Sequence, residues 1–232
     1  MKKMIPSVGR AIRILVSSFG IVTTLAAAAP QRVVPREASE WCNIWVSHAD
    51  KSDLPRALMI GDSISVGYFS DVEKQLAGKA YAAQLSTSRC VGDPVLLAEV
   101  ALVLGGASFD VIHINNGLHG VGPVSEKEYA EFLPQFIEHI RRLAPRAKLV
   151  WASSTPWRVK GTSDKFDPKN ENVLARNRIA AGVMAAQGIP INDLYSLGAE
   201  HPEYFADAAH YNAAGKAGQG ALVAKAIATL LK

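Results

Sequence analysis

Short apolar runs alternate with stretches of helical spacing along most of this chain. The runs with strand character are residues 56–60, 80–86, 109–115, 147–152 and 189–192. The clearest stretches with helical spacing are residues 125–143, 172–187 and 213–231. Buried strands that alternate with helices are typical of a parallel sheet covered on both faces. The pattern therefore predicts an α/β fold in which a parallel sheet lies between two layers of helices.

Residues 1–28 have the features of a secretory signal peptide. A basic start is followed by an apolar run from Ile14 to Ala28, which ends in small alanines. We expect cleavage near Ala28, because a cut one residue later would place Pro30 first in the mature chain. A retained membrane anchor is the alternative, but the run is shorter than the ~20 residues that a spanning helix needs. No later segment is long and apolar enough to span, so the sequence predicts export to the periplasm or the medium.

Residues 29–54 form a polar, proline-containing lead-in segment, and the regular pattern occupies residues 55–232 as a single domain. The composition, 49% hydrophobic and 20% charged, is that of a globular protein. The formal charge of +4 falls to about zero without the four Lys and Arg residues of the leader. The mature chain therefore has no basic field to bind nucleic acid or an anionic membrane surface.

The chain contains two cysteines, Cys42 and Cys90. Oxidising compartments preserve disulfides, so we predict a bridge between them in the exported protein. Two buried thiols are the alternative, because two cysteines alone cannot specify a bond. No Cys-x-x-Cys pair occurs, and no cluster of His, Asp and Glu completes a ligand set. The sequence thus predicts no metal and no cofactor.

Gly61-Asp62-Ser63 follows the first strand of the domain and opens the next helix. Parallel sheets bind ligands at the carboxyl ends of their strands, so chemistry is expected at this turn. The free N–H groups and the dipole of a helix N-terminus favour developing negative charge. Ser63 is therefore a candidate nucleophile, and its alternative role is to cap the helix.

Asp207 and His210 stand just before the last helix. A serine hydroxyl needs a base to become a nucleophile, and histidine supplies one without a large perturbation. An aspartate three residues before the histidine can turn back to accept the Nδ1 proton, which leaves Nε2 free for the serine. The alternative is an Asp–His surface pair that leads into a helix cap.

These two motifs together resemble the SGNH or GDSL hydrolase family, over about residues 55–231. The most specific stretch is residues 55–67, PRALMIGDSISVG. The resemblance implies a flavodoxin-like α/β/α sandwich with about five parallel strands. It also implies cleavage of carboxylic esters through an acyl-serine intermediate. Ser63 would be the nucleophile, His210 the general base and then acid, and Asp207 the orienting carboxylate.

The same family implies an oxyanion hole made from the Ser63 amide, a glycine amide after the second strand and an asparagine side chain after the third. Gly92 is the glycine available at the second place, although the amides of Ser88 and Arg89 remain alternatives. The usual Gly-x-Asn-Asp at the third place is replaced by residues 115–120, NNGLHG.

This replacement places His119 where the family has asparagine. We predict Asn115 as the oxyanion donor and His119 as a substrate contact, with Asn116 and His119 as the other candidates for the donor. A purely structural role, in which the asparagines bond backbone at the strand edge, is also open. Trp157 follows the strand at 147–152 and is the tryptophan that we expect to contact a ligand such as a sugar.

The sequence therefore predicts an exported serine esterase that acts on short acyl esters, such as acetyl groups on carbohydrate. An O-acetyltransferase of the same fold would use the same catalytic groups and pass the acyl group to a sugar. A non-catalytic carbohydrate-binding relative is a third possibility, against which the intact set of Ser63, Asp207 and His210 argues. The expected partner is a small-molecule or carbohydrate ester.

Overall fold

The computed structural model describes Met1, residues 34–162 and residues 164–231. Apart from Met1, the predicted signal peptide lies outside the described residues. From residue 34 onwards, the described residues belong to one compact unit. No helix among them is both long and apolar enough to cross a bilayer.

Six strands form one sheet in the order β1-β3-β2-β4-β5-β6. Their bounds are β1 Cys42–Val46, β2 Arg56–Gly61, β3 Tyr81–Thr87, β4 Val111–Ile114, β5 Lys148–Ala152 and β6 Ile191–Asn192. Strands β2 to β6 run parallel to their neighbours, whereas β1 runs antiparallel to β3 at the edge. The five predicted parallel strands are therefore confirmed.

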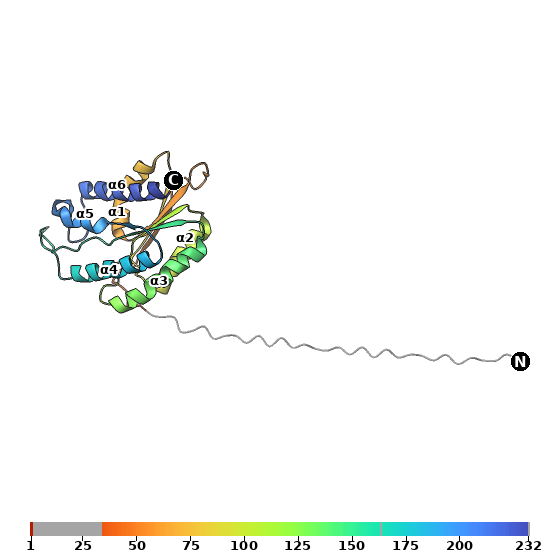
Figure 1. Ribbon diagram of the computed structural model, residues 1–232, viewed down its shortest axis with the longest axis horizontal. Helices are drawn as coiled ribbons and strands as arrows, with labels where there is room; N and C mark the ends of the chain where they lie inside the picture. The colour runs from red at the N-terminus through yellow and green to blue at the C-terminus, as the bar shows by residue number, and fades with distance from the viewer. Residues whose placement is uncertain (2–33, 163, 232) are drawn as a thin grey trace. The chain divides into compact units, whose positions relative to one another are not determined.

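Helices cover both faces of this sheet (Figure 1). They are α1 Ser63–Leu76, α2 Pro94–Gly106, α3 Glu126–Leu143, α4 Asn170–Ala186, α5 Leu194–Glu200 and α6 Ala213–Leu230, with a 3-10 turn η1 at Pro202–Tyr204. Helices α1 and α6 pack together on one face, and α2, α3 and α4 lie against the other. The predicted three-layer α/β/α sandwich is thus confirmed.

The central strand β2 shows why its sequence is an unbroken apolar run. Leu58 and Ile60 pack into the core beneath α2 and α3, whereas Ala57 and Met59 pack into the core beneath α1 and α6. Successive side chains of a strand point to opposite faces, and both faces are covered here. Every residue of β2 is consequently buried.

The lead-in segment belongs to the sheet, which the sequence did not predict. Strand β1 pairs with β3 in a register that places Cys42 opposite Thr87 and Val46 opposite Ala83. Most of β1 is exposed, because it is an edge strand with little cover. Its short sequence CNIWV therefore lacks the hydrophobic pattern that identifies the buried strands.

The predicted disulfide between Cys42 and Cys90 is not formed in the structure. Cys42 lies on the exposed edge strand β1, opposite the end of β3. Cys90 is three residues beyond β3, where the chain has turned inward, and its side chain is buried against Gly120. The prediction was wrong because export and an even cysteine count carry no information about where in the fold each thiol lies.

Candidate active site

Ser63, His210 and Asp207 form a continuous chain of hydrogen bonds. Ser63 Oγ lies 2.9 Å from His210 Nε2, and His210 Nδ1 lies 2.9 Å from Asp207 Oδ2. A carboxylate only accepts hydrogen bonds, so Nδ1 carries the ring hydrogen and Nε2 is left to accept from the serine. The structure thus brings together the three residues that the sequence selected as a nucleophile, a base and an orienting carboxylate.

Ser63 is the first residue of α1, and Asp62 caps that helix. Asp62 Oδ1 accepts the N–H of Ile64 at 2.9 Å, which is the bond that a capping serine would otherwise make. The Ser63 hydroxyl is therefore available to His210, and its amide belongs to the first turn, where helices lack internal acceptors. The turn is tight: a Cβ on Gly61 would lie 2.7 Å from the side chain of Ser65.

Asp207 is held in its ionised form. Its Oδ1 accepts the backbone N–H groups of Ala209 at 2.9 Å and of His210 at 2.8 Å. Burial acts against the charged form, but these N–H groups and the His210 ring lower the pKa of Asp207 to about 2. The carboxylate can therefore stabilise an imidazolium at His210 throughout the neutral range.

Asp62, the residue before Ser63, is buried, with 3% of its surface exposed. Burial raises the pKa of Asp62, and the neighbouring His119 and His210 rings act in the opposite direction. Both imidazoles therefore lie within electrostatic range of the same carboxyl group.

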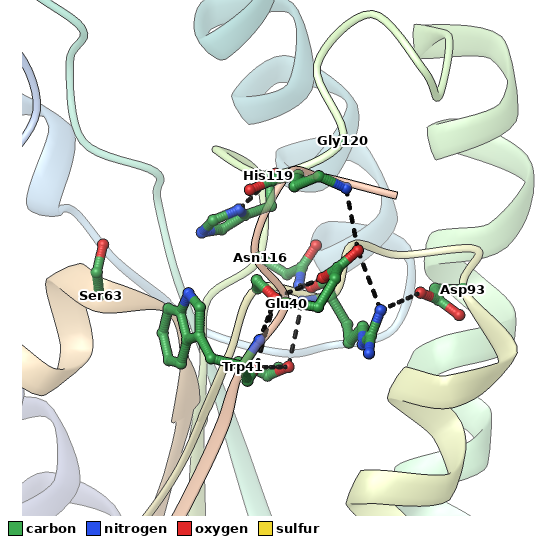
Figure 2. A network of polar contacts seen from close by, with 12 residues as sticks. Glu40, Trp41, Ser63, Asp93, Asn116, His119 and Gly120 are labelled. Carbon is green, nitrogen blue, oxygen red and sulfur yellow. Dashed lines mark hydrogen bonds and ion pairs between the residues drawn. The ribbon is translucent and has the colours of Figure 1, made fainter. Parts of the chain in front are cut away.

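The lead-in segment supplies two residues around His119 that the sequence did not single out for this site, Glu37 and Trp41. His119 Nδ1 lies 2.8 Å from Glu37 Oε1, and the ring meets Trp41 edge-on at a centroid distance of 6.3 Å. Figure 2 shows the His119 and Trp41 rings extending toward the side of the network where Ser63 lies. Neither Glu37 nor Trp41 belongs to a recognisable motif. The pairing of β1 with β3 brings the segment that carries them to the site.

The side chains of Asn115 and Asn116, the candidates for the asparagine of the oxyanion hole, form hydrogen bonds with neighbouring groups. Asn115 Nδ2 donates to Ala152 O at 2.8 Å and lies 3.4 Å from Ser154 Oγ. Asn116 Nδ2 donates to Arg89 O at 2.9 Å, and its Oδ1 accepts from Val91 N. These bonds tie the end of β4 to the loops on either side. The structure records no bond from either asparagine to Ser63 among the described residues.

Three backbone amides after β3 are candidates for the oxyanion hole, those of Ser88, Arg89 and Gly92. Two of them already donate to acceptors. Ser88 N donates to Trp41 O at 3.1 Å, and Arg89 N donates to Thr87 Oγ1 at 3.2 Å. Gly92 lies in the turn before α2 with a φ of +93°, a left-handed conformation that favours glycine. Gly92 therefore remains a prediction for the oxyanion hole.

Two cavities lie in this region. One, of about 200 Å³, is lined by Ser63, His210 and residues of α1 and α6 that include Ile64, Gly67 and Lys216. The other, of about 290 Å³, is lined by the lead-in segment, the loop after β4 and Trp157, with Lys169 Nζ 4.9 Å from the centre of the Trp157 ring. The predicted ligand-facing tryptophan thus borders a cavity, and Glu37 and Glu40 share its wall.

Arg176 of α4 holds the loop that carries His119. Its guanidinium donates to four backbone carbonyl groups, those of Gly117, His119, Gly120 and Val124, at 2.7 to 3.1 Å. The side chain is 1% exposed and stacks on the ring of Tyr129 at 5.0 Å. The loop after β4 is therefore fixed from behind by a residue that no sequence motif indicated.

Within the described residues, no three His, Cys, Asp or Glu side chains come together as a metal centre would require. His113, which the sequence could not assign to a ligand set, is fully buried in β4 and accepts from Asn192 Nδ2 at 3.1 Å.

Comparison with protein-family models and with curated proteins finds no match to this sequence. Similar solved structures include an acetyl xylan esterase (15% identity, TM-score 0.59), Axe2, an acetylxylan esterase from Geobacillus stearothermophilus (17%, 0.58), and a GDSL-like lipase from Bacteroides thetaiotaomicron (19%, 0.57). The alignments cover 74%, 76% and 75% of this chain and 99%, 94% and 88% of those structures. At such identities the likeness is one of fold, and this chain shares the fold of the acetyl xylan esterases and of the GDSL-like lipase.

Proposed function

We propose that this protein is a carboxylic ester hydrolase that acts through an acyl-serine intermediate. The observation that carries the proposal is the hydrogen-bonded chain from Ser63 through His210 to Asp207. The esterases and the lipase that share the fold add support, because an ester hydrolase is what each of them is described to be.

The geometry assigns each group a step. Ser63 Oγ attacks the ester carbonyl carbon while its proton passes to His210 Nε2, and the carbonyl electron pair moves onto oxygen. The Ser63 amide and the dipole of α1 stabilise that oxyanion. Its collapse expels the alkoxide, which takes the proton from His210 and leaves as the alcohol. Water then repeats the sequence on the acyl-serine, and the carboxylic acid is released.

Water is the acceptor that the site favours over a second sugar. The His210 side chain is 48% exposed and that of Asp207 is 54% exposed. Transfer to a sugar requires an acceptor site that keeps competing water away from the intermediate. An open triad argues for hydrolysis, and a transferase would reveal itself by acylated sugar among the products.

Short acyl groups and a carbohydrate alcohol fit the two cavities. The cavity of about 200 Å³ beside Ser63 suits a small acyl group such as acetyl. The larger cavity combines the acidic side chains of Glu37 and Glu40 with the Trp157 ring. Polar groups next to an aromatic side chain are typical of sugar sites. The acetyl xylan esterases of the same fold support the same substrate class.

Ester preference can be measured with p-nitrophenyl esters of increasing chain length and with acetylated xylooligosaccharides. We expect turnover to be highest for acetate and to fall as the chain lengthens. A fluorophosphonate probe should label the peptide that contains Ser63. Ser63→Ala should abolish both signals, whereas Ser70→Ala, an exposed position of the same helix, should leave both unchanged. Normal turnover by a folded Ser63→Ala protein would contradict the proposal.

Export belongs to the same proposal and is supported by the leader at residues 1–28. Expression of the full chain followed by fractionation and N-terminal sequencing tests it. We expect the mature protein outside the cytoplasm, beginning near Ala29. An uncleaved chain in the cytoplasm would contradict this part of the proposal.

A further inference from the structure

A second carboxylate–histidine pair stands beside the triad. His210 Nδ1 lies 2.9 Å from Asp207, and His119 Nδ1 lies 2.8 Å from Glu37. In each pair the carboxylate accepts the Nδ1 hydrogen, so the neutral ring presents Nε2 as an acceptor. His210 uses that acceptor for Ser63, whereas no group among the described residues forms a hydrogen bond with His119 Nε2.

Contacts from three other residues fix the position of His119. Glu37 binds one edge of its ring, Trp41 contacts the ring edge-on, and Arg176 donates to its backbone carbonyl at 2.7 Å. The side chain keeps 19% of its surface exposed. Its remaining polar atom can therefore meet a ligand without a rearrangement of the loop.

An ester group offers acceptors only, so an acceptor at His119 has no partner in the ester itself. The partner must be a donor elsewhere on the substrate. Hydroxyl groups are the donors that a carbohydrate carries next to an ester, and the adjoining cavity with Glu37 and Glu40 provides further acceptors for them. An alcohol part that lacks hydroxyl groups would leave this acceptor unsatisfied, which costs affinity.

We propose that His119, held in the Nδ1–H form by Glu37, accepts a hydrogen bond from a free hydroxyl group that neighbours the scissile ester. The substrate is then a partly acylated polyol or sugar rather than a simple alkyl ester. This inference rests on the proposed ester hydrolysis and specifies the alcohol part of its substrate. His119 acts as a specificity-determining residue, and Glu37 as the positioning residue that sets its tautomer.

The test uses 2-hydroxyethyl acetate and 2-methoxyethyl acetate, in the second of which a methyl group replaces the hydrogen of the donor hydroxyl. One hydrogen bond of about 1 kcal/mol corresponds to roughly a fivefold to tenfold preference. We expect the wild type to favour the hydroxy ester in kcat/KM by about that factor. His119→Ala should reduce the ratio to about one. A monoacetylated methyl xyloside and its O-methylated counterpart should behave in the same way.

Two Glu37 variants test whether Glu37 acts by its hydrogen bond to His119 Nδ1 or only by its negative charge. The amide oxygen of Glu37→Gln can still accept from Nδ1, so the preference should largely persist, whereas Glu37→Leu should lose it. His201→Gln is the matched control, because His201 makes the same 2.8 Å contact to a carboxylate, that of Glu203 in η1. Its preference should equal that of the wild type.

Two outcomes overturn this inference while the proposed ester hydrolysis stands. One is a ratio that His119→Ala leaves unchanged. The other is an equal loss of about 100-fold in kcat for both esters with His119→Ala, which is the loss typical of an oxyanion donor. Failure of the proposed hydrolysis looks different, because the wild type would then turn over neither ester and Ser63 would not react with a fluorophosphonate.

Discussion

The carboxylate of Asp207 binds His210 twice, through its backbone N–H at 2.8 Å and through ring Nδ1 at 2.9 Å. The same group thus closes the turn before α6 and aims the imidazole at Ser63. Structural and catalytic roles of Asp207 coincide in a single side chain, and a suitable substitution can separate them.

Asp207→Asn should keep the turn and lose the chemistry. The amide oxygen can still accept the backbone N–H groups, but the amide N–H₂ would face Nδ1 and favour the wrong ring tautomer. We expect kcat to fall by about 10⁴-fold, as for a comparable triad aspartate. Thermal unfolding followed by circular dichroism should show a Tm close to that of the wild type. A Tm that falls together with the activity would contradict the separation.

The pH profile of activity should contain no limb that belongs to Asp207. With a pKa of about 2, Asp207 is ionised across the working range and contributes no limb above pH 4. The kcat/KM profile on p-nitrophenyl acetate measures this, with a background correction for hydroxide. A limb above pH 4 that is present in the wild type and disappears in Asp207→Asn would belong to Asp207 and would contradict the prediction.

Ser63→Ala and His210→Ala should each remove nearly all activity, by about 10⁶-fold in kcat. The two residues act in one proton transfer, so the double variant should be scarcely worse than either single variant. Single-turnover kinetics on p-nitrophenyl acetate give the comparison. Losses that multiply in the double variant would indicate that Ser63 and His210 act independently.

Arg176→Met should destabilise the loop after β4. The change leaves four carbonyl groups without their donor, two of them buried and two partly buried. Loss of the donor to a buried carbonyl group costs about 1 to 3 kcal/mol before the loop relaxes. We expect the free energy of unfolding in urea to fall by about 3 kcal/mol or more. Arg178→Met, on the exposed side of the same helix, is the control and should change stability little. Equal effects of the two substitutions would contradict the role of Arg176.

Gly120→Ala and Gly122→Ala distinguish steric conflict from backbone strain in this loop. Both glycines have positive φ, +70° and +94°, but a Cβ at Gly120 would lie 2.5 Å from Cys90 Sγ while one at Gly122 meets nothing within 4 Å. Strain alone costs about 1 to 2 kcal/mol, and overpacking adds about 1 to 3. Urea unfolding should therefore show the larger loss for Gly120→Ala. The added Cβ would also lie 2.6 Å from Cys90 Cβ, so only Cys90→Gly removes both clashing atoms. Combination with Cys90→Gly should restore part of the loss measured relative to Cys90→Gly alone, and no restoration would argue against the steric cause.

His113 should make the fold sensitive to mild acid. Burial lowers the pKa of His113 to about 3, whereas the unfolded chain binds the proton near 6.5. Between these values the unfolded state holds more protons, so stability falls as pH falls, by up to about 1.4 kcal/mol per pH unit. His113→Gln keeps an acceptor for Asn192 and removes the titration. The wild type should lose stability relative to this variant from about pH 6 to pH 4, and parallel curves would contradict the assignment.

The sequence predicted the parallel sheet and the triad because both depend on local pattern. Buried strands such as β2 are apolar throughout, and the motifs around Ser63 and His210 stand at strand and helix ends where ligands bind. Chain topology then brings these two residues, 147 positions apart, into hydrogen-bonding distance.

The remainder of the site depends on contacts that no local pattern encodes. Glu37 and Trp41 reach His119 because an exposed edge strand pairs with β3, and Arg176 reaches four carbonyl groups from the far side of a loop. Asn115 was predicted as an oxyanion donor from a one-dimensional alignment with a motif. Its bond to Ala152 O depends on the neighbouring strand β5, which the motif does not include.

The pairing of β1 with β3 also affects the order in which the molecule can assemble. β1 emerges first from the ribosome, yet the edge that receives it exists only after β2, α1 and β3 have formed. Pairings between residues far apart in the chain are slow, because the loop between them must be closed first. The segment that ends in β1 is therefore expected to dock late in folding. Until it does, Glu37 is absent and His119 has no fixed tautomer, so the serine and its base are in place before the groups that select the substrate.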